Sequence, residues 1–200
     1  MKFRPSNLFP CFVFSALGIF VHTALGQDSP PPPPPPPPLI YKAPVESALT
    51  KYVSKEEGFE AVFPGVPTES KSASTDATIS SFSVYVNGSH SSVEIWNFDD
   101  SADLTWSKII DRIRNNIQRI PKSSIESERD VTLSGITGKE FDFLSGYQYQ
   151  RVRIFLSGRR LYIVRVDVTN WHILTKYEPA KVTEFQKESE RFFDSVKLSK

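Results

Sequence analysis

Cysteine is the residue that this sequence most clearly lacks. Among 200 residues there is one cysteine, Cys11, and it lies in an apolar N-terminal run that we expect to be removed. The mature chain would then hold no disulfide, no thiolate nucleophile and no cysteine-ligated metal. An exported domain of this kind must be large enough to be stabilised by its hydrophobic core alone.

Long apolar runs are absent beyond the first 26 residues. That N-terminal segment begins with Lys2 and Arg4, continues in a largely apolar run from Leu8 to Val21, and ends in Ala24-Leu25-Gly26, an A-x-G cleavage site, before Gln27. The pattern is typical of a secretory signal peptide, and its apolar run is shorter than the roughly 20 residues of a membrane-spanning helix. We therefore expect cleavage before Gln27 and a secreted or periplasmic protein. A retained membrane anchor is the alternative.

The sequence also lacks an excess of charge of either sign. It holds 24 basic and 23 acidic residues. Removal of residues 1–26 takes away Lys2 and Arg4 but no acid, which leaves 22 basic against 23 acidic residues. A nearly neutral domain has no global electrostatic attraction to nucleic acids or anionic membranes. We expect no nucleic-acid partner and no integral membrane segment in the mature chain.

Histidine is scarce, and the common catalytic motifs are missing. After processing only His90 and His172 remain, so a zinc site would need both of them together with carboxylates. The sequence contains no G-x-S-x-G, G-x-G-x-x-G or P-loop motif. These observations predict no metal, no cofactor and no enzymatic activity. The alternative is an exported hydrolase that uses His172 or His90 with an aspartate.

Proline is concentrated in one segment. Nine of the 16 prolines are consecutive, from Pro30 to Pro38. Such a run adopts a polyproline II helix of about 3.1 Å per residue, a stiff rod of roughly 28 Å. We interpret residues 27–47 as a proline-rich linker that acts as a spacer, with a docking site for a proline-binding module as the alternative. Residues 48–200 are then expected to form one domain.

Alternating apolar and polar residues predict a sheet in this domain. The expected strands are residues 49–56, 59–63, 78–86, 91–98, 124–133, 139–144, 147–156 and 161–168. Asn87-Gly88 and Gly158-Arg159 are typical of tight hairpin turns. A two-residue turn at Gly158-Arg159 would place Ile154 opposite Ile163 and Arg153 opposite Val164.

Two amphipathic helices are expected to cover this sheet. The first spans about residues 102–120, with Asp99 and Asp100 as capping residues and Pro121 after its end. The second spans about residues 178–194 and has Pro179 in its first turn. The fold class is therefore α+β, a mainly antiparallel sheet covered by helices on both faces, that is, an α/β/α sandwich.

Three segments resemble a known family. They are GFEAVFPGVP at residues 58–67, SGRRLYIVRV at 157–166 and ERFFDSVKL at 190–198. Together they resemble the PsbP/DcrB-like α/β/α sandwich family, which includes exported bacterial proteins of unassigned activity, and the resemblance extends from Leu49 to Leu198. It implies a binding or assembly module without a shared active site. The N-terminal region that gives the photosynthetic members their function has no counterpart in the proline linker.

Two groups of residues are candidates for binding. Arg151 and Arg153 share one face of a strand, where they would meet an anion or an acidic partner. The alternative is that the arginines in this part of the chain pair with Asp167 and nearby glutamates or stack on Tyr147, Tyr149 and Tyr162. Residues 167–179 connect the last long strand to the C-terminal helix and carry Trp171, His172 and Tyr177. The aromatic residues there form either a lid over the sheet edge or exposed anchors for a partner. We expect a monomer that binds a protein or a cell-envelope component.

Overall fold

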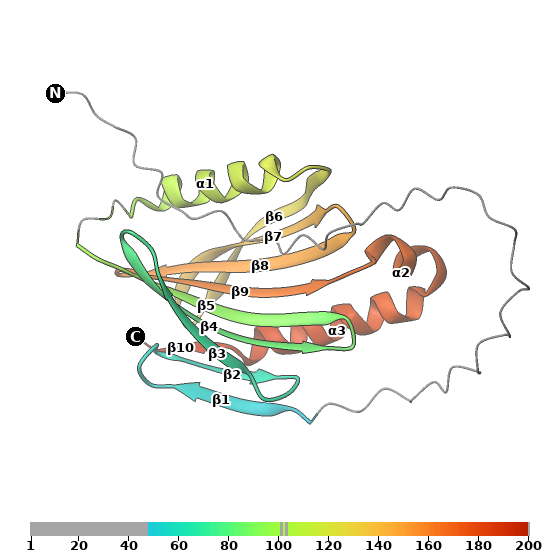
Figure 1. The fold of residues 1–200 in the computed structure, drawn as a ribbon, viewed down its shortest axis with the longest axis horizontal. Coiled ribbons are helices and arrows are strands. Elements are labelled where there is room, and N and C mark those ends of the chain that lie inside the picture. The colour runs from blue at the N-terminus through green and yellow to red at the C-terminus, as the bar shows by residue number, and fades with distance from the viewer. Residues whose placement is uncertain (1–47, 101, 103, 200) are drawn as a thin grey trace, which may run out of the picture. The chain divides into compact units, whose positions relative to one another are not determined.

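A seven-stranded antiparallel sheet forms the centre of the domain (Figure 1). The structure is a computed structural model, and it describes residues 48–100, 102 and 104–199. Its strands are β1 Thr50–Ser54, β2 Phe59–Phe63, β3 Thr68–Ala73, β4 Ala77–Val86, β5 Ser89–Phe98, β6 Ser123–Leu133, β7 Ile136–Ser145, β8 Gln148–Ser157, β9 Arg160–Val168 and β10 Lys197–Leu198. Its helices are α1 Trp106–Arg119, α2 Trp171–Tyr177 and α3 Pro179–Ser195. The expected signal peptide and linker lie outside the described residues.

The strand order in the large sheet is β3-β4-β5-β9-β8-β7-β6. Two meanders, β3 to β5 and β6 to β9, are joined where β5 pairs antiparallel with β9. The expected register after Gly158 is confirmed, because Ile154 pairs with Ile163 and Arg153 with Val164. The expected α+β class with a mainly antiparallel sheet is confirmed as well.

A second, smaller sheet has the order β1-β2-β10. The β1–β2 hairpin turns through Gly58, whose φ of 68° favours glycine. Pro64 follows the last residue of β2 and cannot donate a ladder hydrogen bond. β10 returns after α3 to pair with β2, and the backbone N–H of Val62 donates to Ser195 Oγ over 2.9 Å. The hairpin is therefore tied to the end of α3.

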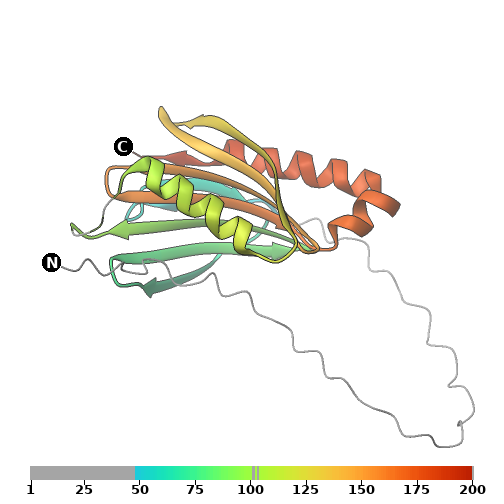
Figure 2. The same cartoon turned by 90° about the horizontal axis from the view of Figure 1, so that it is seen from above.

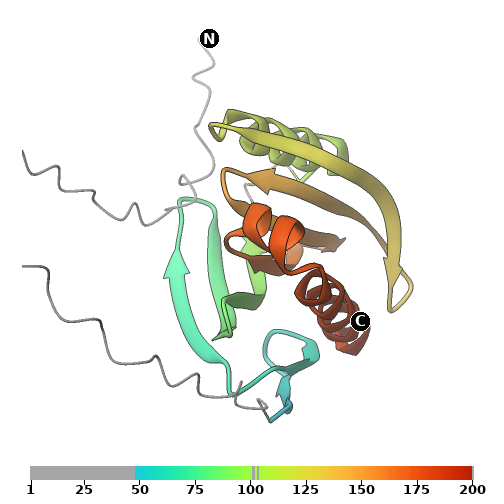
Figure 3. The same cartoon turned by 90° about the vertical axis from the view of Figure 1, so that its right-hand side faces the viewer.

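The helices contact different strands. α1 lies across the sheet in Figure 2 and packs on β6, where Arg114 donates to Glu128 through Nε at 2.8 Å and Nη2 at 2.6 Å. α3 runs beside the β1–β2 hairpin, as Figure 3 shows, and packs on β2. The fully buried aromatic side chains Phe59, Phe63 and Phe193 belong to these two elements. Each such side chain stabilises the fold by roughly 1.5–3 kcal/mol through burial of apolar surface.

Three local features differ from the expectation. All six residues of β3 are exposed and all but Ala73 are polar, so this edge strand has no alternating pattern and the sequence does not reveal it. The segment 167–179, expected as a connection, contains the helix α2. α1 begins at Trp106 rather than near residue 102, with Thr105 at the cap position instead of Asp99 or Asp100. The N–H of Asp99 instead donates to the Asp76 carbonyl in the β3–β4 turn, so Asp99 is not at the start of the helix.

Candidate binding site around α2

Two hairpin turns fix the short helix α2 at one end of the large sheet (Figure 1). Asn170 adopts a left-handed conformation with φ of 57° and redirects the chain after β9. The N–H of Thr169 then donates to the Gly88 carbonyl at 3.4 Å, and the N–H of Trp171 donates to the Tyr147 carbonyl at 3.0 Å. These bonds join α2 to the β4–β5 and β7–β8 turns. They place the predicted aromatic residues at a defined end of the sheet.

Trp171 packs as a lid. Its ring stacks on Tyr149 with centroids 4.3 Å apart and an interplanar angle of 17°. It also meets Phe185 of α3 edge-on at 5.9 Å. Because Trp171 is only half-buried, its outer side still faces solvent. Of the two hypotheses for this segment, the geometry of Trp171 favours the lid, while its part in binding stays a prediction.

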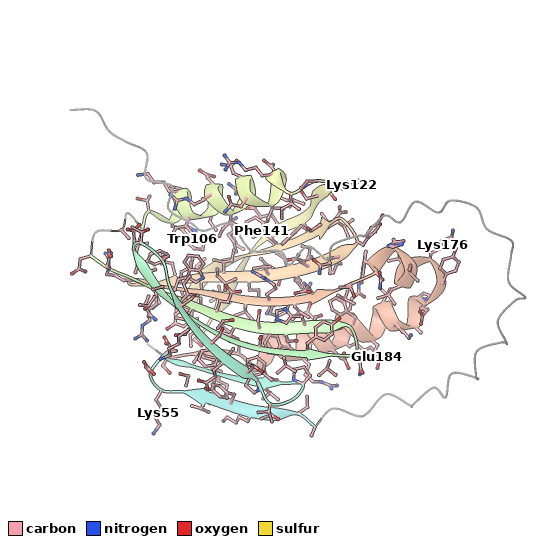
Figure 4. The ribbon with its side chains drawn as sticks, viewed as in Figure 1. Lys55, Trp106, Lys122, Phe141, Lys176 and Glu184 are labelled. Carbon is pink, nitrogen blue, oxygen red and sulfur yellow. The ribbon has the colours of Figure 1, made fainter. Side chains whose placement is uncertain are left out.

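The other aromatic residues around α2 are exposed. Tyr177 is 66% exposed and Tyr147 is 65% exposed, and Ile173 on the same helix is 40% exposed. The His172 ring lies 4.9 Å from the Tyr147 ring. Figure 4 labels Lys176 on α2, and its side chain points away from the sheet. We call Tyr147, His172, Ile173 and Tyr177 the α2 surface; large exposed side chains of this type are enriched at binding interfaces.

A cavity of about 260 Å³ lies between the β7–β8 hairpin and α3. It is lined by Asp142, Tyr149, Arg151, Phe185, Gln186, Ser189 and Glu190. The rings of Tyr149 and Phe185 meet at 82° with centroids 6.0 Å apart, and both contact Trp171. The lid residue Trp171 therefore packs on two aromatic residues of the cavity.

The two predicted arginines are held by carboxylates. Arg151 Nε donates to Asp142 over 3.0 Å and Arg151 Nη1 donates to Glu190 over 2.6 Å. Arg153 donates to Glu140 through Nε and to Glu190 through Nη2 at 3.1 Å. Both arginine side chains are only 13–14% exposed. Pairing with nearby acidic residues, the alternative to anion binding, is therefore what the geometry favours, although anion binding by these residues stays a prediction.

Glu140 is the centre of this ion network. Its side chain is fully buried and receives Arg153 and Arg129 at distances of about 2.5 Å. Burial alone would raise the pKa of Glu140, but the hydrogen bond from Arg153 and the charges of Arg151, Arg153 and Arg129 outweigh it and lower the pKa. The carboxylate is thus held ionised. The guanidinium of Arg153 also lies 4.4 Å from the Phe193 ring centroid, which adds a cation–π contact.

Tyr149 differs from an ordinary exposed tyrosine. Burial and the charge of Asp142 raise the pKa of Tyr149 to about 12. A hydrogen bond between its hydroxyl and Asp142 contributes to the same rise. The proton of this hydroxyl is therefore directed at the Asp142 carboxylate.

The surroundings of the two histidines bear on the hydrolase alternative. His90 Nδ1 lies 2.9 Å from Asp167 Oδ1, because β5 and β9 place the two residues opposite each other. Among residues 48–100, 102 and 104–199, no serine hydroxyl is hydrogen-bonded to His90 or to His172.

In the same part of the chain, no group of three or more histidine, cysteine and acidic residues is placed to hold a metal. Nor is any helix there long and apolar enough to cross a membrane.

Sequence reasoning considered acidic partners for the arginines but did not identify Glu140, Asp142 and Glu190, although a signal for the first two was present. The strands 139–144 and 147–156 were expected as neighbours in a meander. Their observed register pairs Glu140 with Arg153 and Asp142 with Arg151. Alternating acids on one strand and alternating arginines on the next favour cross-strand ion pairs. Glu190 carries no such signal, because it comes from a helix that is distant in the sequence.

Comparisons with known proteins agree with this fold. No protein-family model and no curated protein matches the chain. The chain is similar to the solution structure of cyanobacterial PsbP (CyanoP) from Synechocystis sp. PCC 6803, with a TM-score of 0.52 and 12% identity, covering 76% of this chain and 93% of that one. It is also similar to PA94, a protein of unknown function from Pseudomonas aeruginosa, with a TM-score of 0.39 and 18% identity, covering 69% and 94%. The expected PsbP-like fold is confirmed by the first likeness.

Proposed function

We propose that this chain is an exported, non-catalytic binding or assembly module of the cell envelope, presented on a polyproline spacer. The α2 surface is the region that contacts a partner protein or another envelope component. One observation carries the proposal: Tyr147, Ile173 and Tyr177 are exposed together around a helix that two hairpin turns hold in place. Side chains of this kind bind partners with little loss of conformational freedom, because their backbone is already fixed.

Within this proposal, the domain is an α/β/α sandwich. α1 contacts Glu128, which lies opposite Phe141 of β7 in the sheet. α3 contacts Arg151, which lies opposite Asp142 of β7. Phe141 and Asp142 are consecutive residues of the same strand. Neighbouring residues of a strand point to opposite faces. The two helices would then cover opposite faces and leave α2 at the end of the sheet to meet a partner.

Replacement of Tyr177 by alanine is expected to reduce partner recovery without changing stability. Its side chain is 66% exposed, so truncation removes contact area for a partner but little packing within the domain. The measurement is a pull-down from the native envelope with the mature chain as bait, together with the urea midpoint. Val53→Ala is the matched control, because Val53 is 52% exposed on β1, away from the α2 surface. Equal recovery with Tyr177→Ala and Val53→Ala would contradict binding through this surface.

Export is expected to remove residues 1–26. The protein isolated from its native host should therefore begin at Gln27 in N-terminal sequencing. A mature protein that still begins at Met1 would mean that the apolar segment is retained as an anchor.

A hydrolase remains the second candidate because one observation favours it. His90 and Asp167 form a hydrogen-bonded pair, and the His90 side chain is 29% exposed. A carboxylate can orient a histidine as a general base in this way. The proposal of a binding module takes precedence because no hydroxyl nucleophile joins this pair in the part of the chain that the structure describes.

A further inference from the structure

The charges around the cavity between β8 and α3 compensate one another. Arg151 lies between Asp142 and Glu190 and donates a hydrogen bond to each. Glu190 is also bound by Arg153, and the buried Glu140 is bound by Arg153 and Arg129. The network therefore holds three guanidinium groups and three carboxylates. An anionic ligand would therefore meet two carboxylates, and a cationic ligand would meet a guanidinium. The cavity therefore does not favour binding of a charged ligand of either sign, because each would be repelled by a like charge at short range.

The same groups retain hydrogen-bonding capacity for a neutral ligand. Asp142 accepts one bond from Arg151 through Oδ1 and one from Ser127 through Oδ2. The Tyr149 hydroxyl also hydrogen-bonds to Asp142. A carboxylate has about four acceptor positions, so Asp142 can still accept about one hydroxyl donor. Gln186, on the exposed side of α3, adds an amide that both donates and accepts. Tyr149 adds a phenolic oxygen that can accept a hydrogen bond, since its proton is directed at Asp142.

One wall of the cavity is aromatic. Tyr149 and Phe185 present rings at 82° to each other, and Trp171 stacks on Tyr149 and fixes its orientation. Rings of this kind pack against the C–H groups of a saturated ring. At about 260 Å³ the cavity is slightly smaller than the roughly 300–1,000 Å³ of sites for drug-sized ligands. It therefore has room for one small ring rather than for a chain of them.

We propose that this cavity binds a single uncharged, hydroxyl-rich ring, that is, one neutral sugar unit at the end of a glycan. Asp142 and Glu190 accept from its hydroxyl groups, Gln186 holds it at the opening, and the aromatic wall packs on its C–H face. Tyr177 does not line the cavity. The proposal is consequently independent of the partner contact at the α2 surface, and either can fail without the other.

The test is an NMR titration of the mature chain, observed through its backbone amide signals. The probes are methyl glucoside, methyl galactoside and N-acetylglucosamine, with inorganic phosphate and ethylammonium as charged comparisons. We expect saturable shifts at residues 149–151 and 185–190 with at least one sugar, at millimolar concentration. No saturable shift with any of the three sugars, or stronger binding of phosphate or ethylammonium at these residues, would overturn the proposal.

A pair of variants on α3 shows whether the sugar occupies the cavity itself. Gln186→Trp places a large side chain at the opening, and Lys187→Trp places the same side chain at the next exposed position, which does not line the cavity. We expect at least about tenfold weaker sugar binding with Gln186→Trp, which corresponds to about 1.4 kcal/mol, and unchanged binding with Lys187→Trp. Equal binding by the two variants would place the sugar elsewhere and overturn the proposal. Their melting midpoints establish that both are folded.

Discussion

Replacement of Glu140 by glutamine is expected to lower the free energy of unfolding by about 3–5 kcal/mol, the range for breaking a buried ion pair. The side chain of Glu140 is fully buried and is bound by Arg129 and Arg153. Glutamine keeps the shape but removes the charge, so the partly buried guanidinium groups of Arg151 and Arg153 lose a compensating anion. Since whole domains have stabilities of only about 5–15 kcal/mol, the variant should be close to unfolding. Urea midpoints measure the difference.

Asp130→Asn is the matched control for this prediction. Asp130 pairs with Lys139 on the same hairpin at 2.9 Å, but its side chain is 74% exposed. Exposed ion pairs contribute only about 0–1 kcal/mol because water screens them. The urea midpoint of Asp130→Asn should therefore be close to that of the unmodified chain. Similar losses of stability in the two variants would mean that burial does not increase the contribution of the Glu140 ion pairs.

The same network predicts a dependence on pH. Because the folded-state pKa of Glu140 is lowered from 4.5, folding favours its ionised form. The stability that this carboxylate contributes is fully present above its unfolded pKa, and it is lost as the pH falls through the folded-state pKa. The unmodified chain should consequently lose more stability below about pH 4.5 than Glu140→Gln, which has no carboxylate to protonate. Parallel losses for the two proteins in acid would contradict the assignment.

Trp171→Ala is expected to cost about 3 kcal/mol, near the lower end of the range for removal of a large aromatic side chain. The ring stacks on Tyr149 and meets Phe185, so its loss uncovers both. The cost stays at the lower end because Trp171 is half-exposed in the folded chain. The urea midpoint is the measurement. Recovery of a partner, corrected for the folded fraction, is expected to change little.

Trp171→Phe is the control for this change. Phenylalanine keeps an aromatic ring on Tyr149 and should lose less than half of the stability that alanine loses. An unchanged midpoint with reduced partner recovery for Trp171→Ala would show that Trp171 is an exposed anchor and not a lid. An unchanged midpoint with unchanged recovery would contradict both hypotheses for this residue.

Much of the sheet could be predicted from the sequence because its signals are local. Alternation with period two located β2, β4, β5, β8 and β9 within a residue or two, and turn residues with positive φ separated them. Gly158 and Arg159 set the β8–β9 register, since a two-residue turn leaves only one pairing of the strands. The apolar stripe of α1 and the first-turn proline of α3 located the helices for similar reasons.

The candidate site could be predicted only in part. Sequence reasoning selected Trp171, His172 and Tyr177, but it treated their segment as a connection because seven residues are too few for a clear helical period. Arg151 and Arg153 were selected as a basic pair for an anion, with pairing to acidic residues as the alternative, and the structure shows their guanidinium groups bound by carboxylates. No local pattern could have placed Glu190 beside them.

The sequence by itself determined most of the long strands, the hairpin turns and the two long helices, because these choices depend on residues that are close along the chain; it did not determine β3 or α2. Tertiary structure decided which segments meet. Pairing of β5 with β9 joined the two meanders, and the return of α3 brought Glu190 to Arg151 and closed the cavity. Burial of Glu140 among Arg129, Arg151 and Arg153 likewise depends on the packing of three strands against one another. These contacts join residues that are far apart in the sequence, so no local pattern of residues predicts them.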